Sequence, residues 1–320
     1  MLIDTGSGDV IVNPGLYVPG KSSQNLNATF ANVYGTTSSN GTGNGMVVGP
    51  LYADQVNFDS LSATQVIGLA TGTSTLPGDG IVGFSGPRFT QFPGNSTSFF
   101  QSLCTQGQVT DCRFGLALHN GSVGSLILGE LDTTMYTGSL TVAPILTGWA
   151  LTGDLAINGN VIARDLTIEL DSGTGTIVGP IDAVTSIFAT TGIQGVLQNT
   201  TDGPLLTGYF PCDKPPTVGF SFPSQTNAST ATGSVSHNST VFNIPTSLWS
   251  TGNNGGNNCT AVMSGQDYPN ATGLWVAGQP FFQGIYIDYN LADETVGFAP
   301  LKTLATMNTT STSQPASAGY

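Results

Sequence analysis

Apolar residues in this chain occur in short runs that predict strands. Most runs are about four to eight residues long and are bounded by Gly, Pro or Asn, and few have a helical period. Clear examples are residues 79–84 and 274–278. Helices are expected only over residues 97–103 and, because Pro180 suits a first helical turn, over about 181–189. The pattern therefore predicts an all-β fold with a few short helices.

The two halves of the chain repeat one order of features. Each half has an Asp-hydroxyl-Gly-hydroxyl turn, which runs from Asp4 to Ser7 in the first half and from Asp171 to Thr174 in the second. Further along each half comes an apolar strand that contains or ends in glycine. Together with the length of 320 residues, this weak internal duplication predicts two lobes. We expect them at 1–145 and 146–300, followed by a Ser/Thr-rich disordered tail at 301–320.

Charge and glycosylation motifs narrow the class of protein. The chain has 6 Lys plus Arg against 19 Asp plus Glu, a formal net charge of −13. We therefore expect no nucleic-acid partner, because little in the chain could neutralise phosphates. Ten Asn-X-Ser/Thr motifs suit a secreted glycoprotein. No leader or membrane-spanning run is visible, and we expect a secreted protein whose leader is missing from this sequence. The motifs begin at Asn27, Asn40, Asn95, Asn120, Asn199, Asn227, Asn238, Asn258, Asn270 and Asn308.

The four cysteines allow three pairings. Chain order favours Cys104 with Cys112 and Cys212 with Cys259, which is one bridge in each half. The cysteine spacings and the two histidines provide no metal-ligand motif, so we expect neither a metal nor a cofactor.

The paired Asp turns point to a specific chemistry. Two carboxyl groups held together in a partly dry cleft cannot both ionise freely, so they share a proton. One carboxylate can then take a proton from a bound water while the other hydrogen-bonds a substrate carbonyl. This arrangement would hydrolyse an amide without a covalent intermediate. Gly6 and Gly173 allow tight turns, and hydroxyl groups beside them can orient the carboxylates.

These motifs and several others occur in the order found in pepsin-type secreted aspartic proteases, and the chain resembles that family, in particular its fungal members. The resemblance implies a bilobal fold of two six-stranded-barrel-like lobes. It also implies a monomer that cleaves polypeptide substrates at acidic pH. It covers nearly all of residues 2–300 and rests on 3–7, 33–35, 79–84, 99–103, 126–129, 136–140, 170–174, 179–180, 274–278 and 296–300.

The same resemblance assigns roles to individual residues. Asp4 and Asp171 would be the catalytic dyad. The dyad would be supported by Thr5 and Ser172, which lock the two turns together, by Ser7 and Thr174, which bond the carboxylates, and by Gly6 and Gly173. A flap and substrate-binding group would comprise Tyr34, Gly35, Ile11 and Ile81, with Ile11 standing where many relatives carry a Trp that anchors the flap tyrosine. Cys212 with Cys259 matches the disulfide of the family's carboxyl lobe.

Glu169 lies two residues before Asp171, and therefore on the same face of a regular strand. We hypothesise that it lines a primed-side subsite and favours basic or polar substrate side chains when it is ionised. The alternative is a glutamate turned to solvent at a strand end.

The sequence also departs from the family. Strands that precede the first Asp turn in the family are absent, as are the leader and the inhibitory propeptide. We therefore expect an incomplete first lobe and a chain that, as written, folds poorly or is inactive. Two alternatives to an active protease remain: an inactive pepsin-like glycoprotein that acts only in binding, and a glycoside hydrolase that uses the two carboxylates.

Overall fold

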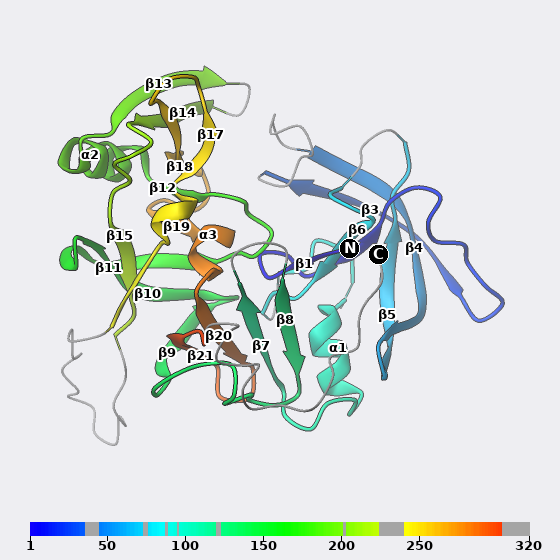
Figure 1. The fold of residues 1–320 in the computed structure, drawn as a ribbon. Helices are drawn as coiled ribbons and strands as arrows, with labels where there is room; N and C mark the ends of the chain where they lie inside the picture. Colours follow the sequence, from blue (N-terminus) through cyan, green and yellow to red (C-terminus); the bar gives the residue numbers. More distant parts are fainter. Residues whose placement is uncertain are drawn as a thin grey trace.

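The computed structural model describes residues 1–35, 45–72, 76–86, 89–94, 96–119, 123–200, 203–223 and 240–302. Apart from Leu301 and Lys302, the tail predicted at 301–320 lies outside these ranges. Within them the chain forms two large sheets and a few short helices, which confirms the all-β fold (Figure 1). Six of the potential glycosylation sites also lie outside the described residues, namely Asn40, Asn95, Asn120, Asn227, Asn238 and Asn308.

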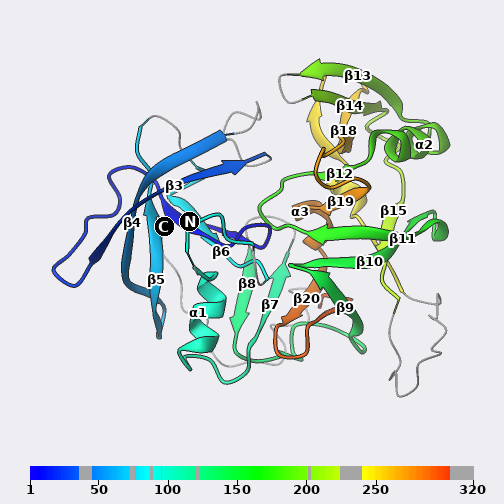
Figure 2. The same ribbon diagram turned by 180° about the vertical axis from the view of Figure 1, so that it is seen from behind.

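The first sheet has six strands and makes up one side of the molecule, drawn in blue to cyan in Figures 1 and 2. In spatial order they are β1 (Leu2–Asp4), β6 (Gly80–Gly83), β2 (Val10–Val12), β5 (Leu61–Leu69), β4 (Gly45–Phe58) and β3 (Gln24–Tyr34). The long hairpin of β3 and β4 lies at one edge, and β1 lies at the other, toward the second sheet.

The second sheet has 15 strands and joins both halves of the chain. Its main path is β13 (Gln194–Thr200), β14 (Gly203–Phe210), β18 (Cys259–Gly265), β12 (Ile177–Gly179), β19 (Leu274–Ala277), β11 (Asn160–Leu170), β10 (Ala150–Ile157), β9 (Thr141–Thr147), β21 (Thr295–Pro300), β20 (Ile285–Asn290), β7 (Arg113–Leu118) and β8 (Gly124–Leu128). Three short strands pair beside it: β15 (Val218–Ser221), β16 (Val241–Asn243) and β17 (Ser250–Asn253). Strands β7 and β8 belong to the stretch expected in the first lobe, yet they pair into this sheet through β20.

The internal duplication expected from the sequence is visible in the strand pairing. In the first half β1 runs parallel to β6, and β2 pairs antiparallel on the other side of β6. In the second half β11 runs parallel to β19, and β12 pairs antiparallel on the other side of β19. Each Asp turn therefore follows a strand that pairs in parallel with the apolar strand of its own half. This repeat brings both turns to equivalent places.

The helices are short and begin where the sequence offers a start signal. Helix α1 (Phe99–Thr105) begins after Ser98, whose N–H donates to Gln101 Oε1 at 3.2 Å. Helix α2 (Ile181–Thr191) begins after Pro180 and ends at Gly192, which takes the left-handed conformation with φ 76°. Helix α3 (Gln279–Phe282) and a 3₁₀ turn at Thr246–Leu248 complete the set. Both helices expected from the sequence are present, with ends shifted by two residues.

The core between the halves is aromatic. Phe114 stacks on Tyr289 with ring centroids 4.5 Å apart, and Trp149 packs edge-on against both rings. The Trp149 Nε1–H donates to the carbonyl of Phe84 at 2.7 Å, so this buried indole has its polar partner. Phe114 lies on β7 and Tyr289 on β20, whereas Trp149 directly precedes β10. Together these side chains bind the two halves into one core.

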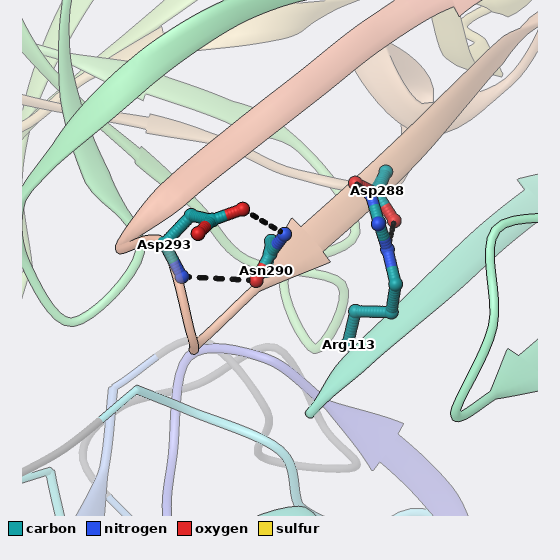
Figure 3. Close-up of polar contacts among 4 residues, drawn as sticks. All are labelled: Arg113, Asp288, Asn290 and Asp293. Carbon is teal, nitrogen blue, oxygen red and sulfur yellow. Dashed lines mark hydrogen bonds and ion pairs between the residues drawn. The ribbon is translucent and has the colours of Figure 1, made fainter. Parts of the chain in front are cut away.

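An ion pair joins β7 and β20 in the larger sheet. Arg113 on β7 donates to both carboxylate oxygens of Asp288 on β20, at 3.1 and 2.5 Å (Figure 3). Next to it Asn290 donates to Asp293 at 2.9 Å and accepts the Asp293 N–H, which fixes the turn between β20 and β21. Burial raises the pKa of Asp288 although Arg113 opposes the shift. The bidentate pair is nearly buried, which makes it stronger than a surface salt bridge.

Both disulfides form as chain order favoured. Cys104 pairs with Cys112 at the end of α1, and Cys212 pairs with Cys259 beside β14 and β18. The Cα atoms lie 5.3 and 5.1 Å apart, within the usual range for a bridge. Each half of the chain therefore has one covalent cross-link.

Candidate active site

The two Asp turns meet between the halves and are interlocked by four hydrogen bonds. The Thr5 hydroxyl donates to the carbonyl of Leu170 at 2.8 Å and accepts the N–H of Ser172 at 2.9 Å. In return the Ser172 hydroxyl donates to the carbonyl of Ile3 at 2.7 Å and accepts the N–H of Thr5 at 3.0 Å. Each hydroxyl thus satisfies two backbone groups of the opposite turn, which fixes the relative position of the two turns.

Within each turn the carboxylate is held in the same way. Asp4 accepts the Gly6 N–H on Oδ1 at 2.9 Å and the Ser7 hydroxyl on Oδ2 at 2.5 Å. Asp171 accepts the Gly173 N–H on Oδ1 at 2.7 Å and the Thr174 hydroxyl on Oδ2. The charge of Asp171 acts on Asp4, which indicates that the two carboxyl groups are neighbours. The site is therefore a pair of neighbouring carboxyl groups with mirrored supports.

The glycines of the two turns are required by this arrangement. A Cβ on Gly6 would lie 2.5 Å from Asp171 Cγ, and a Cβ on Gly173 would overlap Asp4 Oδ1. Each glycine therefore lies against the carboxyl group of the other half, and no side chain fits there without separating the two groups. The predicted motif thus has a steric reason at both positions.

Burial controls the protonation of the pair. Asp4 is 3% exposed, and its pKa is raised well above the ordinary value, first by burial and then by the charge of Asp171. Hydrogen bonds from Ser7 and Gly6 oppose the shift without cancelling it. The pair therefore keeps one proton at pH values where an isolated aspartic acid has lost its own.

Tyr34 lies beside this pair at the end of β3. Its side chain is 7% exposed, and its hydroxyl group accepts from Asn32 Nδ2 at 3.3 Å. Burial is the main cause of the raised pKa of the phenol. Gly35 follows it as an exposed residue at the bend where the described part of the hairpin stops. The charges of Asp9 and Asp4 also raise the pKa of the Tyr34 phenol, which indicates that this sequence-predicted tyrosine lies near the first Asp turn.

Ile11 and Ile81 occupy a different place from the one expected. They are register partners on β2 and β6, and neither has any exposed surface. Both belong to the cluster that packs beneath Tyr34, together with Phe30 and Phe92. Fully buried side chains do not contact a substrate, so we assign these two residues to packing under the hairpin. Their strands are central in the sheet, which is why both of their faces are covered.

Glu169 lies between β10 and β19 and is only partly exposed, so it does not extend freely into solvent. Burial and, second, the charge of Asp171 raise its pKa to about 7. The pKa of Tyr268 is raised to about 12 by burial and by the charges of Glu169 and Asp171, which indicates that its hydroxyl group lies near both carboxyl groups.

The structure adds residues that the sequence reading missed. They are Tyr268 and two buried polar residues of the first half, Asp9 and Asn32. Asn32 could have been found, because it lies two positions before Tyr34 and so shares its strand face. Tyr268 gave no such signal, since it reaches the site from the loop between β18 and β19.

The site thus consists of two neighbouring aspartates on interlocked turns, one from each half of a bilobal all-β fold. Residues 1–301 match the family profile of the eukaryotic aspartyl proteases, and the chain belongs to that family. It is an aspartic-type endopeptidase with the pepsin-like fold.

Relatives in fungi and mammals agree with this assignment. The chain is 31% identical over 320 residues to an aspartic protease of Phaffia rhodozyma, covering 92% of this chain and 72% of the relative. It is 31% identical over 304 residues to secreted aspartyl protease 1 of Malassezia globosa, covering 93% and 69%. Pepsin A of Rhinolophus ferrumequinum is 28% identical over 324 residues, with 94% and 77% covered.

Proposed function

We propose that this endopeptidase hydrolyses internal peptide bonds of polypeptides at acidic pH, with Asp4 and Asp171 as the catalytic dyad. The observation that carries the proposal is the convergence of the two carboxyl groups on Gly173, whose Cβ would lie within 3.0 Å of an oxygen of each, supported by mirrored bonds from both halves. A shared proton leaves one group able to accept a proton from water and the other able to donate to a carbonyl oxygen. Because the pKa of Asp4 is raised, this mixed state extends upward through the acidic range.

The reaction then follows from the geometry. A water molecule bound between the carboxyl groups loses a proton to the ionised one as it attacks the peptide carbon. The protonated carboxyl group hydrogen-bonds the carbonyl oxygen and stabilises its developing negative charge. The carboxyl group that received the water proton passes it to the leaving nitrogen, which regenerates the starting state. Tyr34 would close over the substrate from the β3–β4 hairpin.

The matched turns argue against a glycoside hydrolase. That chemistry needs two carboxyl groups but no interlocked hydroxyl-Gly turn beneath each of them. Here the two turns are locked together by Thr5 and Ser172, and each carboxyl group is fixed by its own turn. The intact pair likewise argues against a relative that acts only in binding.

The direct test is hydrolysis of a peptide with two bulky apolar residues at its centre, assayed from pH 2 to pH 7. The sequence alone led us to expect an inactive chain, but because both Asp turns are complete and interlocked we expect cleavage in the acidic range. We also expect competitive inhibition by a statine peptide and incorporation of one ¹⁸O atom from labelled water into the new carboxyl end. A protein that binds the statine peptide yet leaves the substrate intact would be a binding protein, and the proposal would be wrong.

We also propose that the enzyme acts outside the cell, because one relative is named a secreted aspartyl protease. The two disulfides agree with an oxidising compartment. None of the described helices is long and apolar enough to span a membrane.

Glu169 is proposed to line a subsite on the primed side, next to Tyr268. Since its pKa is about 7, it is protonated at pH 4 and increasingly ionised near neutrality. We therefore expect the ratio of kcat/KM for a peptide with Lys at this subsite to that for its Leu analogue to rise several-fold from pH 4 to pH 7. The ratio cancels the titration of the dyad, which both peptides share.

Two variants test this assignment. Glu169→Gln should keep the ratio constant with pH, because its amide does not ionise. Glu130→Gln, at an exposed glutamate away from the site, is the matched control and should behave as the unmodified protein does. An unchanged pH dependence in Glu169→Gln would remove Glu169 from the subsite.

A further inference from the structure

Asp9 is a buried carboxylic acid that the proposed reaction does not use. It is 1% exposed, follows the first Asp turn, and accepts the Asn32 Nδ2–H at 2.8 Å. It also accepts the backbone N–H groups of Gln91 at 2.7 Å and Phe92 at 3.4 Å. Both salt bridges of the described residues are made by other carboxylates, so Asp9 is held by neutral donors. Burying such a group is unfavourable unless its bonds stabilise something specific.

Asn32 carries the link from Asp9 to Tyr34. Its side chain is completely buried, and Nδ2 lies within hydrogen-bond distance of both Asp9 Oδ2 and the Tyr34 hydroxyl, at 2.8 and 3.3 Å. An amide nitrogen has two hydrogens, so one is available for each acceptor. The orientation of the Asn32 side chain therefore fixes the oxygen of Tyr34 relative to Asp9.

Tyr34 in turn lies close to Asp4. The Ser7 hydroxyl donates to Asp4 in the turn that leads into Asp9. The charges of Asp9 and Asp4 both raise the pKa of the Tyr34 phenol, so its hydroxyl group lies near both carboxyl groups. The hydrogen bonds from Asp9 through Asn32 to Tyr34 thus place the phenol beside the turn that carries Asp4.

The segment around Gln91 ties the same hairpin from the other side. Its side-chain amide accepts the Val33 N–H at 3.0 Å and donates to the Val33 carbonyl at 3.3 Å. Its backbone N–H meanwhile donates to Asp9. Asp9 thus fixes the Asn32 side chain directly, and it fixes Val33 through the segment around Gln91. These are the two residues that precede Tyr34.

We propose that Asp9 and Asn32 are positioning residues that fix the phenol of Tyr34, and with it the end of β3, relative to the turn that carries Asp4. The inference rests on the proposed function, and it assigns to a buried Asp-Asn pair the anchoring of the flap tyrosine. Ile11, which has no polar atom in its side chain, lies in the packing beneath and makes no such bond.

A double-mutant cycle tests the proposal. Asn32→Leu removes the donor at nearly constant volume, Tyr34→Phe removes the acceptor, and the third variant combines them. We expect each single change to lower kcat/KM by about ten- to one-hundred-fold. The kcat/KM of the double variant should be within about two-fold of that of the less active single variant, because both changes break the same linkage. Effects that multiply would overturn the proposal.

Asn13→Ala is the matched control for a merely structural role. Asn13 is a buried asparagine of the same half, bonded to the backbone of Leu76 and Gly78 at 2.8 Å. The Asn13→Ala change should lower the Tm and leave kcat/KM of the folded protein unchanged. If Asn32→Leu behaves in this way, the positioning role is wrong.

Two further measurements keep the outcome clear. Should Asn32→Leu fail to fold, Asp9→Asn replaces it in the cycle, and its effect should vanish in the Tyr34→Phe background. If the unmodified protein does not hydrolyse peptides, the proposed function fails, and the cycle is then read from the calorimetric affinity for a statine peptide. Coupled losses of affinity would support the linkage, and independent losses would overturn it.

Discussion

Replacing Asp171 with Asn should lower kcat for peptide hydrolysis by at least about a thousand-fold. The amide keeps the shape of the side chain and can still accept the Gly173 N–H through its oxygen. It cannot take a proton from water, however, so the pair loses its base or its acid. Asp4→Asn should have an effect of the same size, since each carboxyl group has the same set of supports.

The loss should be catalytic and leave the fold intact. Removing the charge of Asp171 removes one of the two main causes of the raised pKa of Asp4, so Tm should stay the same or rise. Asp182→Asn, at an exposed residue in the first turn of α2, is the control and should keep full activity. A kcat for Asp171→Asn within ten-fold of the unmodified enzyme would exclude this dyad as the catalytic pair.

The protein should be most stable in acid and should lose stability as the pH rises toward neutrality. The pKa values of Asp4, Asp9, Glu169 and Asp288 are all raised in the folded state, with burial as the largest cause in each. Between the ordinary pKa and the raised one, the folded protein keeps a proton that the unfolded chain has released. The free energy of unfolding therefore falls with increasing pH across that window.

The size of the effect can be bounded from Glu169. Its pKa rises from 4.5 to about 7, which corresponds to at most about 3 kcal/mol lost between pH 4 and pH 7. Asp54 and Asp213 have lowered pKa values and act in the opposite sense, but their hydrogen bonds lie near the surface and contribute little. With the buried carboxyl groups together, we expect a Tm about 10 °C higher at pH 4 than at pH 7.

Thermal unfolding followed by circular dichroism, scanned fast enough to limit self-digestion, measures this slope. Glu169→Gln should flatten it, because the amide does not titrate. Exposed Glu130→Gln should leave it unchanged. A Tm that is constant or rises from pH 4 to pH 7 would show that these carboxyl groups do not control stability.

Much of this architecture could be predicted because it depends on local signals. The two Asp turns are short motifs whose glycines have a steric purpose, and the parallel pairing of β1 with β6 and β11 with β19 follows from two similar halves. The helix starts at Ser98 and Pro180 are equally local. In such cases the residue that carries the signal also makes the interaction.

Contacts between distant residues could not be predicted in the same way. The distribution of strands between the sheets depends on β7 pairing with β20, and no pattern within β7 specifies that partner. The burial of Ile11 and Ile81 depends on how the β3–β4 hairpin packs over the sheet. Asp9 was missed because its donors, Asn32 and the 91–92 backbone, come from two other segments.

The pairing of β7 with β20 also limits when the enzyme can become active during its synthesis. Arg113 and Asp288 are separated by 175 residues, so β7 emerges from the ribosome long before its partner strand exists. Until β20 and β21 arrive, the aromatic core around Phe114 lacks Tyr289, and the sheet that carries Asp171 has no connection to β7. A nascent chain therefore holds both Asp turns without the packing that joins the two halves, and we expect proteolysis only after the last strands have folded into place.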